Sequence, residues 1–344
     1  MNKSRGFIGK NTILIFSLFC DIMIAIKRTV LSRLFLFCPG FVLGLFLCEV
    51  YMSGRRAGMQ RAKNTKNDEF YTQYQDIAAE CDHYLDQFRN KVIYCNCDTE
   101  CSNFVRYFLN LKSQGIIRDV IWSGGLGGID FRSPESVAML QQADVVVTNP
   151  PFSLFRQYVA QLIESGKQFL ILGNQNAISY KDFFPLFKSG QVRLGYKSFG
   201  PLLFDVPVVE PDKTYKVVDG VPRAVVAVCW FTNLQTPDKN GLVLSKRYFG
   251  NESCYPKYDN IDAINVGRIK DIPMDYDGLI GVPITFMGCY NPAQFVLMGL
   301  DEELTDNRDR CTINGQRLYA RIFIRKKSAS VVANDNDNLT VFAA

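Results

Sequence analysis

Histidine is nearly absent from this chain of 344 residues, in which His83 is the only one. A Ser-His-Asp triad, or a metal centre built from several histidines, would have to use this residue. Its neighbours follow a helical pattern that predicts an exposed position on a helix surface. The sequence therefore argues against both kinds of active site.

A disulfide framework is also lacking. The 11 cysteines are odd in number and show no framework spacing, which is typical of reduced thiols in the cytoplasm. The tightest group is Cys95, Cys97 and Cys101, which has neither a CxxC spacing nor a fourth ligand nearby. We expect small buried thiols at a strand end and no metal, with a zinc site as the alternative.

Outside the first fifty residues, the chain has almost no net charge. The net charge is +5, and residues 1–51 contribute +4 of it through six basic and two acidic side chains. The rest of the chain sums to +1, so net charge gives no indication of a nucleic-acid partner, and any basic surface must be local. The hydrophobic fraction of 47% is enough for a large core.

Residues 1–51 differ in character from the rest because residues 12–26 and 30–51 are strongly apolar. The uncharged run Leu34–Cys48 is shorter than the roughly 20 residues that span a bilayer. Three interpretations stay open: a membrane anchor, a signal segment, or upstream sequence read from a start codon assigned too early. The polar, basic stretch after Met52 and Met59 favours the third, and a membrane partner is expected only if the anchor is real.

From residue 68 onward, strand and helix patterns alternate. Ser102 and Ser133-Pro134 are typical helix starts, and Gly166 is a typical helix end. Apolar runs predict strands at 92–95, 120–122, 145–147 and 169–172, and less clearly at 225–230 and 242–244. Continuous apolar strands alternating with helices are typical of a parallel sheet buried on both faces, so we expect a Rossmann-like, doubly wound α/β fold.

Ligands of such folds bind beyond the carboxyl ends of the strands. Polar side chains occupy these positions: Asn96, Asp98, Asp130, Asn149 and Asn174. The corresponding division of the chain is an extension at 1–51, a ligand-binding core at 52–200, the remaining sheet with a further region at 201–327, and a disordered tail at 328–344.

The most informative motif is Thr148-Asn149-Pro150-Pro151-Phe152, which follows an apolar strand and precedes a helix. The prolines fix the backbone and lack N–H groups, so a carbonyl oxygen and the Asn149 amide oxygen can face a ligand. Two fixed acceptors suit an exocyclic NH2 group, and Phe152 can stack on a base that has left its helix. The alternative is an ordinary strand-ending turn.

Asn-Pro-Pro followed by an aromatic residue is the hallmark of amino-methyltransferases that use S-adenosylmethionine. More closely, the chain resembles the EcoRI-type adenine-specific DNA methyltransferase family from about residue 63 to 327. The resemblance rests on DEFYTQY (68–74), VIYCNCD (92–98), SNF with an aromatic pair (102–108), DFRS (130–133), VVTNPPFSLFR (146–156), RYFGNES (247–253), YPKYDN (255–260), DAINV (262–266), KDIP (270–273) and GVPITF (281–286).

This resemblance implies a class I S-adenosylmethionine-dependent methyltransferase with a C-terminal DNA-recognition region. It makes Asn149, Pro150 and Phe152 the catalytic residues. The implied cofactor-binding residues are Phe70, Tyr71, Thr72, Asn96, Asp98, Asp130, Phe131 and Asn149, and the implied DNA-binding residues are Arg247, Tyr248, Asn251, Tyr255, Lys257 and Tyr258. For the last group, buried tyrosines in ordinary loops are the alternative.

The chain departs from the general methyltransferase pattern in two places. Asn96-Cys97-Asp98-Thr99-Glu100 replaces the usual Asp-x-Gly-x-Gly cofactor loop, and Trp122-Ser123 stands where an acidic residue usually holds the ribose. Individual cofactor contacts at these two turns are therefore open.

We expect a cytoplasmic, monomeric, site-specific adenine N6-methyltransferase that acts on double-stranded DNA, with GAATTC as the site suggested by the family and a cognate restriction endonuclease as a functional partner. A cytosine C5 enzyme would need a Pro-Cys nucleophile, and no cysteine follows a proline. The alternatives are an RNA or protein-glutamine methyltransferase, or a membrane-anchored protein without enzymatic activity.

Overall fold

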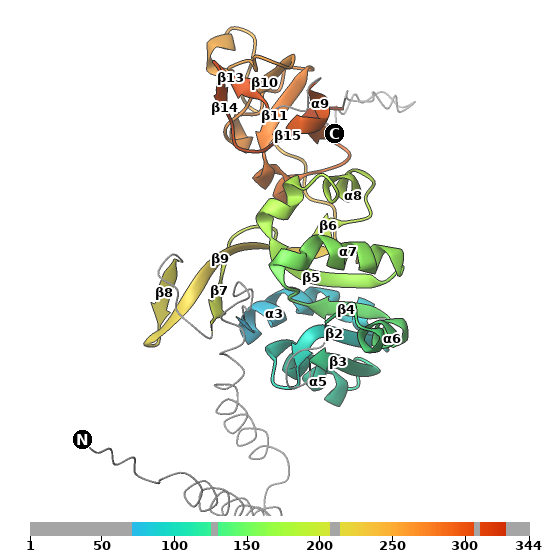
Figure 1. Ribbon diagram of the computed structural model, residues 1–344. Coiled ribbons are helices and arrows are strands. Elements are labelled where there is room, and N and C mark those ends of the chain that lie inside the picture. Colours follow the sequence, from blue (N-terminus) through green and yellow to red (C-terminus); the bar gives the residue numbers. More distant parts are fainter. Residues whose placement is uncertain (1–70, 125–129, 207–213, 306–309, 328–344) are drawn as a thin grey trace, which may run out of the picture. The chain divides into compact units, whose positions relative to one another are not determined.

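The computed structural model describes residues 71–124, 130–206, 214–305 and 310–327 (Figure 1). The chain divides into two units, 1–67 and 68–344, and all described residues belong to the second. Phe70, the apolar extension at 1–51 and the tail at 328–344 lie outside the described residues, so the expectations for them stay predictions.

Four parallel strands form one half of the large sheet, in the order β3-β2-β4-β5 (Figure 1). They are β2 (Val92–Thr99), β3 (Asp119–Gly124), β4 (Val145–Thr148) and β5 (Gln168–Asn174). Their centres coincide with the four apolar runs, which confirms the predicted parallel sheet. Helices α5 (Asn103–Ser113), α6 (Pro134–Gln142) and α7 (Phe155–Glu164) connect them.

The helix starts also follow the sequence. The Ser102 hydroxyl accepts the Val105 N–H at 3.1 Å, and the Ser133 hydroxyl accepts the Ser136 N–H at 3.1 Å. Each bond satisfies one of the backbone donors that a helix leaves unpaired in its first turn. Gly166 has φ +62°, the left-handed conformation that ends many helices.

The second half of the sheet is antiparallel. The strand predicted at 225–230 is confirmed as the centre of β9 (Val221–Thr232), but its antiparallel pairing was not predicted. The long strand β9 runs antiparallel to β5. Its other partners are β6 (Arg193–Leu194), β7 (Pro201–Asp205) and β8 (Tyr215–Val218). Strand β1 (Tyr71–Thr72) completes this edge by pairing antiparallel with β7.

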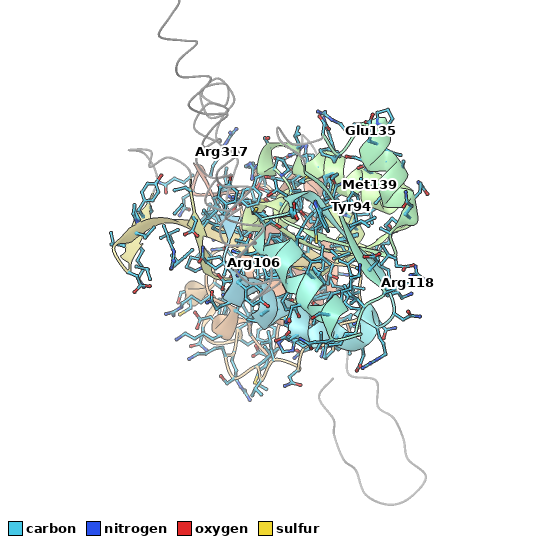
Figure 2. All side chains as sticks on the ribbon, turned by 90° about the horizontal axis from the view of Figure 1, so that it is seen from below. Tyr94, Arg106, Arg118, Glu135, Met139 and Arg317 are labelled. Carbon is cyan, nitrogen blue, oxygen red and sulfur yellow. The ribbon has the colours of Figure 1, made fainter. Side chains whose placement is uncertain are left out.

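The alternation of side chains along the strands creates two hydrophobic layers. On one face, Ile93, Val147 and Leu172 pack with helices α3 (Tyr74–Cys81), α4 (Leu85–Phe88) and α5. On the other, Tyr94, Val146 and Ile171 pack with α6, α7 and α8 (Phe184–Lys188). Tyr94 and, on α6, Glu135 and Met139 are labelled in Figure 2. Helices on both faces make the fold doubly wound.

A smaller sheet follows, in the order β10-β11-β15-β12. Its strands are β10 (Ala263–Asn265), β11 (Leu279–Pro283), β12 (Phe295–Leu300) and β15 (Arg321–Lys326). The short helix α9 (Asp301–Leu304) follows β12, and strands β13 (Thr312–Ile313) and β14 (Gln316–Arg317) form a hairpin before β15. Part of this sheet shares a hydrophobic cluster with α7 and α8.

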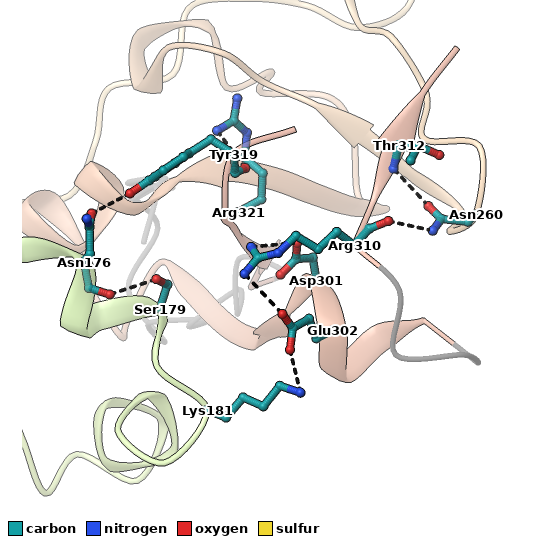
Figure 3. Close-up of polar contacts among 10 residues, drawn as sticks. All are labelled: Asn176, Ser179, Lys181, Asn260, Asp301, Glu302, Arg310, Thr312, Tyr319 and Arg321. Carbon is teal, nitrogen blue, oxygen red and sulfur yellow. Dashed lines mark hydrogen bonds and ion pairs between the residues drawn. The ribbon is translucent and has the colours of Figure 1, made fainter. Parts of the chain in front are cut away.

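Polar contacts also connect the segment after β5 to the smaller sheet (Figure 3). The Tyr319 hydroxyl donates at 2.6 Å to the side-chain oxygen of Asn176, which belongs to the short helix η3 (Gln175–Ser179). Lys181 forms an ion pair with Glu302 at 2.5 Å, and Arg310 pairs with the same carboxylate at 3.2 Å.

The strand expected at Leu242–Leu244 is wrong, because residues 241–245 have no strand partner. The Gln294 side chain takes that role instead. Its oxygen accepts the Leu242 N–H at 2.7 Å, and its nitrogen donates to the Leu242 carbonyl at 2.8 Å. Val243 is 94% exposed, so the apolar run does not enter a sheet.

Candidate active site

The Asn-Pro-Pro-Phe motif lies at the carboxyl end of β4, as predicted. Pro151 leads directly into the single turn η2 (Phe152–Leu154), where the Leu154 N–H donates to the Pro151 carbonyl at 3.0 Å. Helix α7 begins at the next residue. The Phe152 side chain is half-buried at the edge of the hydrophobic layer formed with α3, α4 and α5.

Asn149 is oriented by a residue from the far edge of the sheet. Its side-chain nitrogen donates to the Thr72 hydroxyl at 3.4 Å. Thr72 is held in turn, because its carbonyl accepts the Asn103 side-chain N–H at 2.8 Å and its backbone pairs with Phe204 of β7. The structure thus brings together two predicted site residues, Thr72 and Asn149, that are 77 positions apart.

The carboxyl end of β2, where its register shifts between Cys95 and Thr99, contacts the same motif through Thr148. The Thr148 hydroxyl is fully buried and lies 2.6 Å from Asp98 Oδ2, and it also contacts the Asn96 carbonyl oxygen. Gly124, at the end of β3, approaches this end of β2 so closely that a Cβ there would collide with the Asp98 carbonyl. Asn96 and Asp98 therefore lie beside the Asn-Pro-Pro-Phe motif, as expected from the parallel order of the strands.

Burial dominates the electrostatics of Asp98. It raises the pKa of this carboxyl from 3.8 to about 7, against the opposing effect of hydrogen bonds from Thr148 and Ser102. Burial likewise raises the pKa of the neighbouring Cys97 thiol. Cys97 itself adopts φ +68°, a conformation uncommon for a residue with a side chain, so the backbone turns sharply here.

Buried polar groups lie beside this end of β2. The Asn96 side-chain oxygen accepts the Ser123 hydroxyl at 3.0 Å. The fully buried hydroxyl of Tyr158 on α7 lies next to the Asn96 side chain, which lowers the pKa of this phenol against the larger, opposite effect of burial. Sequence reasoning missed Tyr158 because nothing in a helical pattern distinguishes a core tyrosine from one that faces a ligand.

Asp130 and Phe131 lie in the loop before α6, and they differ in exposure to solvent. Asp130 is exposed and pairs with Arg132 at 2.6 Å; the hydrogen bond from Arg132 lowers the pKa of Asp130. Phe131 is buried and meets the Tyr158 ring edge-on, with 5.0 Å between the ring centroids. Phe131 therefore contacts Tyr158, which in turn lies next to the Asn96 side chain.

These groups fit the chemistry of S-adenosylmethionine. A buried carboxyl, a buried amide and a buried hydroxyl, and aromatic rings meet at the carboxyl ends of β2 and β4, where doubly wound folds bind nucleotides. Among residues 71–124, 130–206, 214–305 and 310–327, no cluster of three or more His, Cys, Asp or Glu side chains is arranged to hold a metal ion.

The predicted DNA-binding residues divide into two groups. Tyr248, Tyr255 and Tyr258 are only 5–8% exposed. The first two pack on one another, with ring centroids 5.7 Å apart, and the third donates its hydroxyl to Asn265 at 2.9 Å. These three side chains therefore match the alternative interpretation from the sequence, which was buried tyrosines in ordinary loops.

In contrast, Arg247, Asn251 and Lys257 are exposed on the same segments. Arg247 lies next to the buried Tyr248, whose backbone N–H donates to Asp275 at 2.6 Å. The buried rings thus anchor the backbone from which the exposed polar side chains project.

Asn-Pro-Pro-Phe lies beyond the end of β4, the third of the four parallel strands along the chain. A doubly wound sheet with this motif at that edge is typical of an amino-methyltransferase of class I fold. Comparison with known proteins identifies the family. The family model for the adenine-specific methyltransferase EcoRI matches residues 58–123 and 117–327.

The curated relatives agree. The type II methyltransferase M.EcoRI of Escherichia coli is 40% identical over 315 residues, which cover 78% of this chain and 96% of that protein. The type II methyltransferase M.MpnI of Mycoplasma pneumoniae is 38% identical over 310 residues, covering 78% and 97%. The chain therefore belongs to the EcoRI family of adenine-specific methyltransferases, and it is a DNA methyltransferase of the type II restriction-modification class.

The alternative of a membrane-anchored protein without activity finds no support in the described residues, where no helix has the length and apolar character needed to cross a bilayer. Residues 12–51, on which that alternative rests, lie outside them.

Proposed function

We propose that this enzyme transfers a methyl group to N6 of an adenine that has been flipped out of duplex DNA, with Asn149 and the Pro150 carbonyl as the two acceptors for the amine. The observation that carries the proposal is the placement of Asn149. It stands at the end of β4, its amide nitrogen is engaged by Thr72, and the end of β2 that holds Asp98 contacts its neighbour Thr148.

The chemistry needs positioning more than proton transfer. Because the Asn149 nitrogen donates to Thr72, the amide oxygen is the atom that accepts a hydrogen from the target amine. Two acceptors draw the amine out of conjugation with the ring, which makes its lone pair available. S-adenosylmethionine supplies an activated methyl group on a cationic sulfur. The site's contribution is to align the nitrogen with that methyl group and exclude water.

Phe152 is proposed to stack on the flipped adenine. It follows the prolines directly and is only half-buried, so a face of its ring can meet a ligand. The cofactor is proposed to lie along Tyr71, Thr72, Asn96, Asp98, Asp130 and Phe131, with Phe70 as a further contact outside the described residues.

DNA contact is proposed to come from the exposed Arg247, Asn251 and Lys257, while the buried tyrosines hold their backbone in place. Cations at such positions neutralise phosphates, and base readout requires further side chains in a groove. GAATTC is the first target site to test. We further propose a monomeric cytoplasmic enzyme whose methylation protects DNA against a cognate endonuclease.

The test uses isotopically labelled S-adenosylmethionine with duplex DNA, structured RNA and a glutamine-containing protein as competing acceptors. The expected product is N6-methyladenine in DNA, and sequencing of DNA from cells that express the chain then gives the recognition site. The Asn149→Ala variant serves as the control. Label in RNA or protein and none in DNA would overturn the proposal.

A further inference from the structure

The Thr148 hydroxyl faces two groups that normally only accept hydrogen bonds. Its oxygen contacts the Asn96 carbonyl oxygen and lies 2.6 Å from Asp98 Oδ2. A hydroxyl has a single hydrogen to donate, and an ionised carboxylate has none. Both contacts can be hydrogen bonds at once only if Asp98 carries a proton and donates it to Thr148 Oγ1.

The surroundings of Asp98 agree with a protonated carboxyl. Burial raises its pKa to about 7 and outweighs the hydroxyls that favour the ionised form, which are Ser102 and, only in the orientation in which it donates to the carboxylate, Thr148. The thiols of Cys95 and Cys97 and the phenol of Tyr158 also face it. Burial raises the pKa of each, so all three are neutral at physiological pH and none offers a counter-charge.

We propose that Asp98 holds a proton while the cofactor site is empty and releases it to solvent when the positively charged S-adenosylmethionine binds, and that Thr148 is the positioning residue that connects this event to Asn149. The inference rests on the proposed function, because it assumes that the cofactor binds at the carboxyl end of β2. A positive charge brought near a carboxyl favours its ionised form, so binding and proton release are linked.

Thr148 is suited to this role by its place in the chain. It is fully buried, it precedes Asn149 directly, and its hydroxyl connects the end of β4 to the carboxyl end of β2. In the empty site its hydrogen goes to the Asn96 carbonyl and its oxygen accepts from Asp98. Once Asp98 is ionised, the hydroxyl can donate to the carboxylate instead, which changes the bonding of the residue next to the amine acceptor.

The experiment titrates the full chain with S-adenosylmethionine in a calorimeter, at several pH values and in two buffers that differ in ionisation enthalpy. Wild type is expected to release close to one proton below pH 7, and its affinity should fall by up to about tenfold per pH unit there. Asp98→Asn, which has nearly the same shape and no proton to lose, should bind more weakly at pH 7.5 and release none.

A pair of Thr148 variants decides the direction of the hydrogen bond. If Thr148 accepts the Asp98 proton, Thr148→Val removes the acceptor of the neutral form, and the midpoint of proton release shifts to lower pH. If Thr148 donates to an ionised Asp98, the midpoint shifts to higher pH, and the proposal is wrong. Thr148→Ser keeps the hydroxyl and should resemble wild type in its midpoint and turnover, whereas Thr148→Val should lower turnover about tenfold or more at saturating cofactor.

The outcomes separate this inference from the proposed function. Tight binding of S-adenosylmethionine with no proton release at pH 6 in wild type would overturn the role of Asp98 and leave the methyltransferase function intact. Failure of the folded chain to bind S-adenosylmethionine at all would overturn both.

Discussion

The side-chain nitrogen of Asn149 donates a hydrogen bond to the Thr72 hydroxyl at 3.4 Å. Strand β1 brings Thr72 to this position by pairing with β7. The contact leaves the amide oxygen of Asn149 as the acceptor that we propose for the target amine, so a residue at the far edge of the sheet orients this side chain.

Asn149→Ala should lower turnover by at least about 100-fold while S-adenosylmethionine binding survives, because an acceptor used in the transition state is lost. Thr72→Val should lower turnover by a smaller factor. Thr72→Ser keeps the hydroxyl and should retain most of the wild-type turnover. Single-turnover kinetics on a duplex substrate, together with cofactor titration, measure both effects. Turnover of Asn149→Ala close to wild type would refute its assigned role.

Phe152→Ala should weaken capture of the flipped adenine by about 1–3 kcal/mol, the usual contribution of base stacking on an aromatic ring. A mismatch opposite the target lowers the cost of flipping and should partly rescue the variant. Leu154→Ala, in the same short turn, is the matched control and should show no such rescue. If the mismatch helps both variants equally, Phe152 has a packing role.

Glu80→Ala should destabilise the fold by about 2–4 kcal/mol, because three donors in buried or partly buried hydrogen bonds lose their acceptor. The Glu80 carboxylate is 1% exposed and accepts from the Tyr196 and Lys197 backbone N–H groups at 2.7 and 2.8 Å and from the Tyr84 hydroxyl at 3.0 Å. Denaturant unfolding measures the loss.

Asp76→Ala is the control for Glu80, because it removes only the partly exposed ion pair with Lys197. Pairs of this kind contribute about 1 kcal/mol or less. An equal loss in the free energy of unfolding of the two variants would show that the buried Glu80 carboxylate does not stabilise the segment after β6 more than a surface ion pair does.

Arg247→Ala and Lys257→Ala should each reduce the salt dependence of DNA binding by about one unit of slope if each contacts a phosphate. Arg118→Ala is the matched control, because this cation pairs with Asp144 at 3.1 Å just before β3 and β4, at the opposite end of the strands from the site. Binding measured from low to moderate salt should separate the two sets. An unchanged slope in both would remove these residues from the DNA surface.

Asp98→Asn should stabilise the cofactor-free protein at neutral pH relative to wild type. The pKa of Asp98 is about 7 in the folded state, and the ordinary value is 3.8. Between these values the folded chain binds a proton that the unfolded chain has lost, so wild-type stability falls as pH rises through this window. The difference in melting temperature between variant and wild type should grow from pH 4 to 7 and then level off.

Asp119→Asn provides a control of opposite sign. The hydrogen bond from Lys112 lowers the pKa of Asp119, so its contribution to stability is present above pH 4 and is lost in acid. A melting-temperature difference for Asp98→Asn that does not change with pH would contradict the raised pKa.

Local sequence patterns are enough to predict the parallel half of the sheet, its helix starts and the position of the Asn-Pro-Pro-Phe motif. Each depends on a few consecutive residues: apolar runs such as Val145–Val147, a serine cap before α5 or α6, and two prolines after a strand. Because parallel strands end at a common edge, the approach of Asn96 and Asp98 to the motif also followed from the chain order.

The residues that complete the site come together only through tertiary contacts. Thr72 reaches Asn149 through antiparallel pairing with a strand more than a hundred residues later, and Tyr158 faces Asn96 from a helix whose pattern marks only a core position. Burial likewise separated the three tyrosines of the C-terminal segments from their exposed basic neighbours. Such contacts depend on pairing and packing between distant segments, and local sequence patterns carry no record of the distance between them.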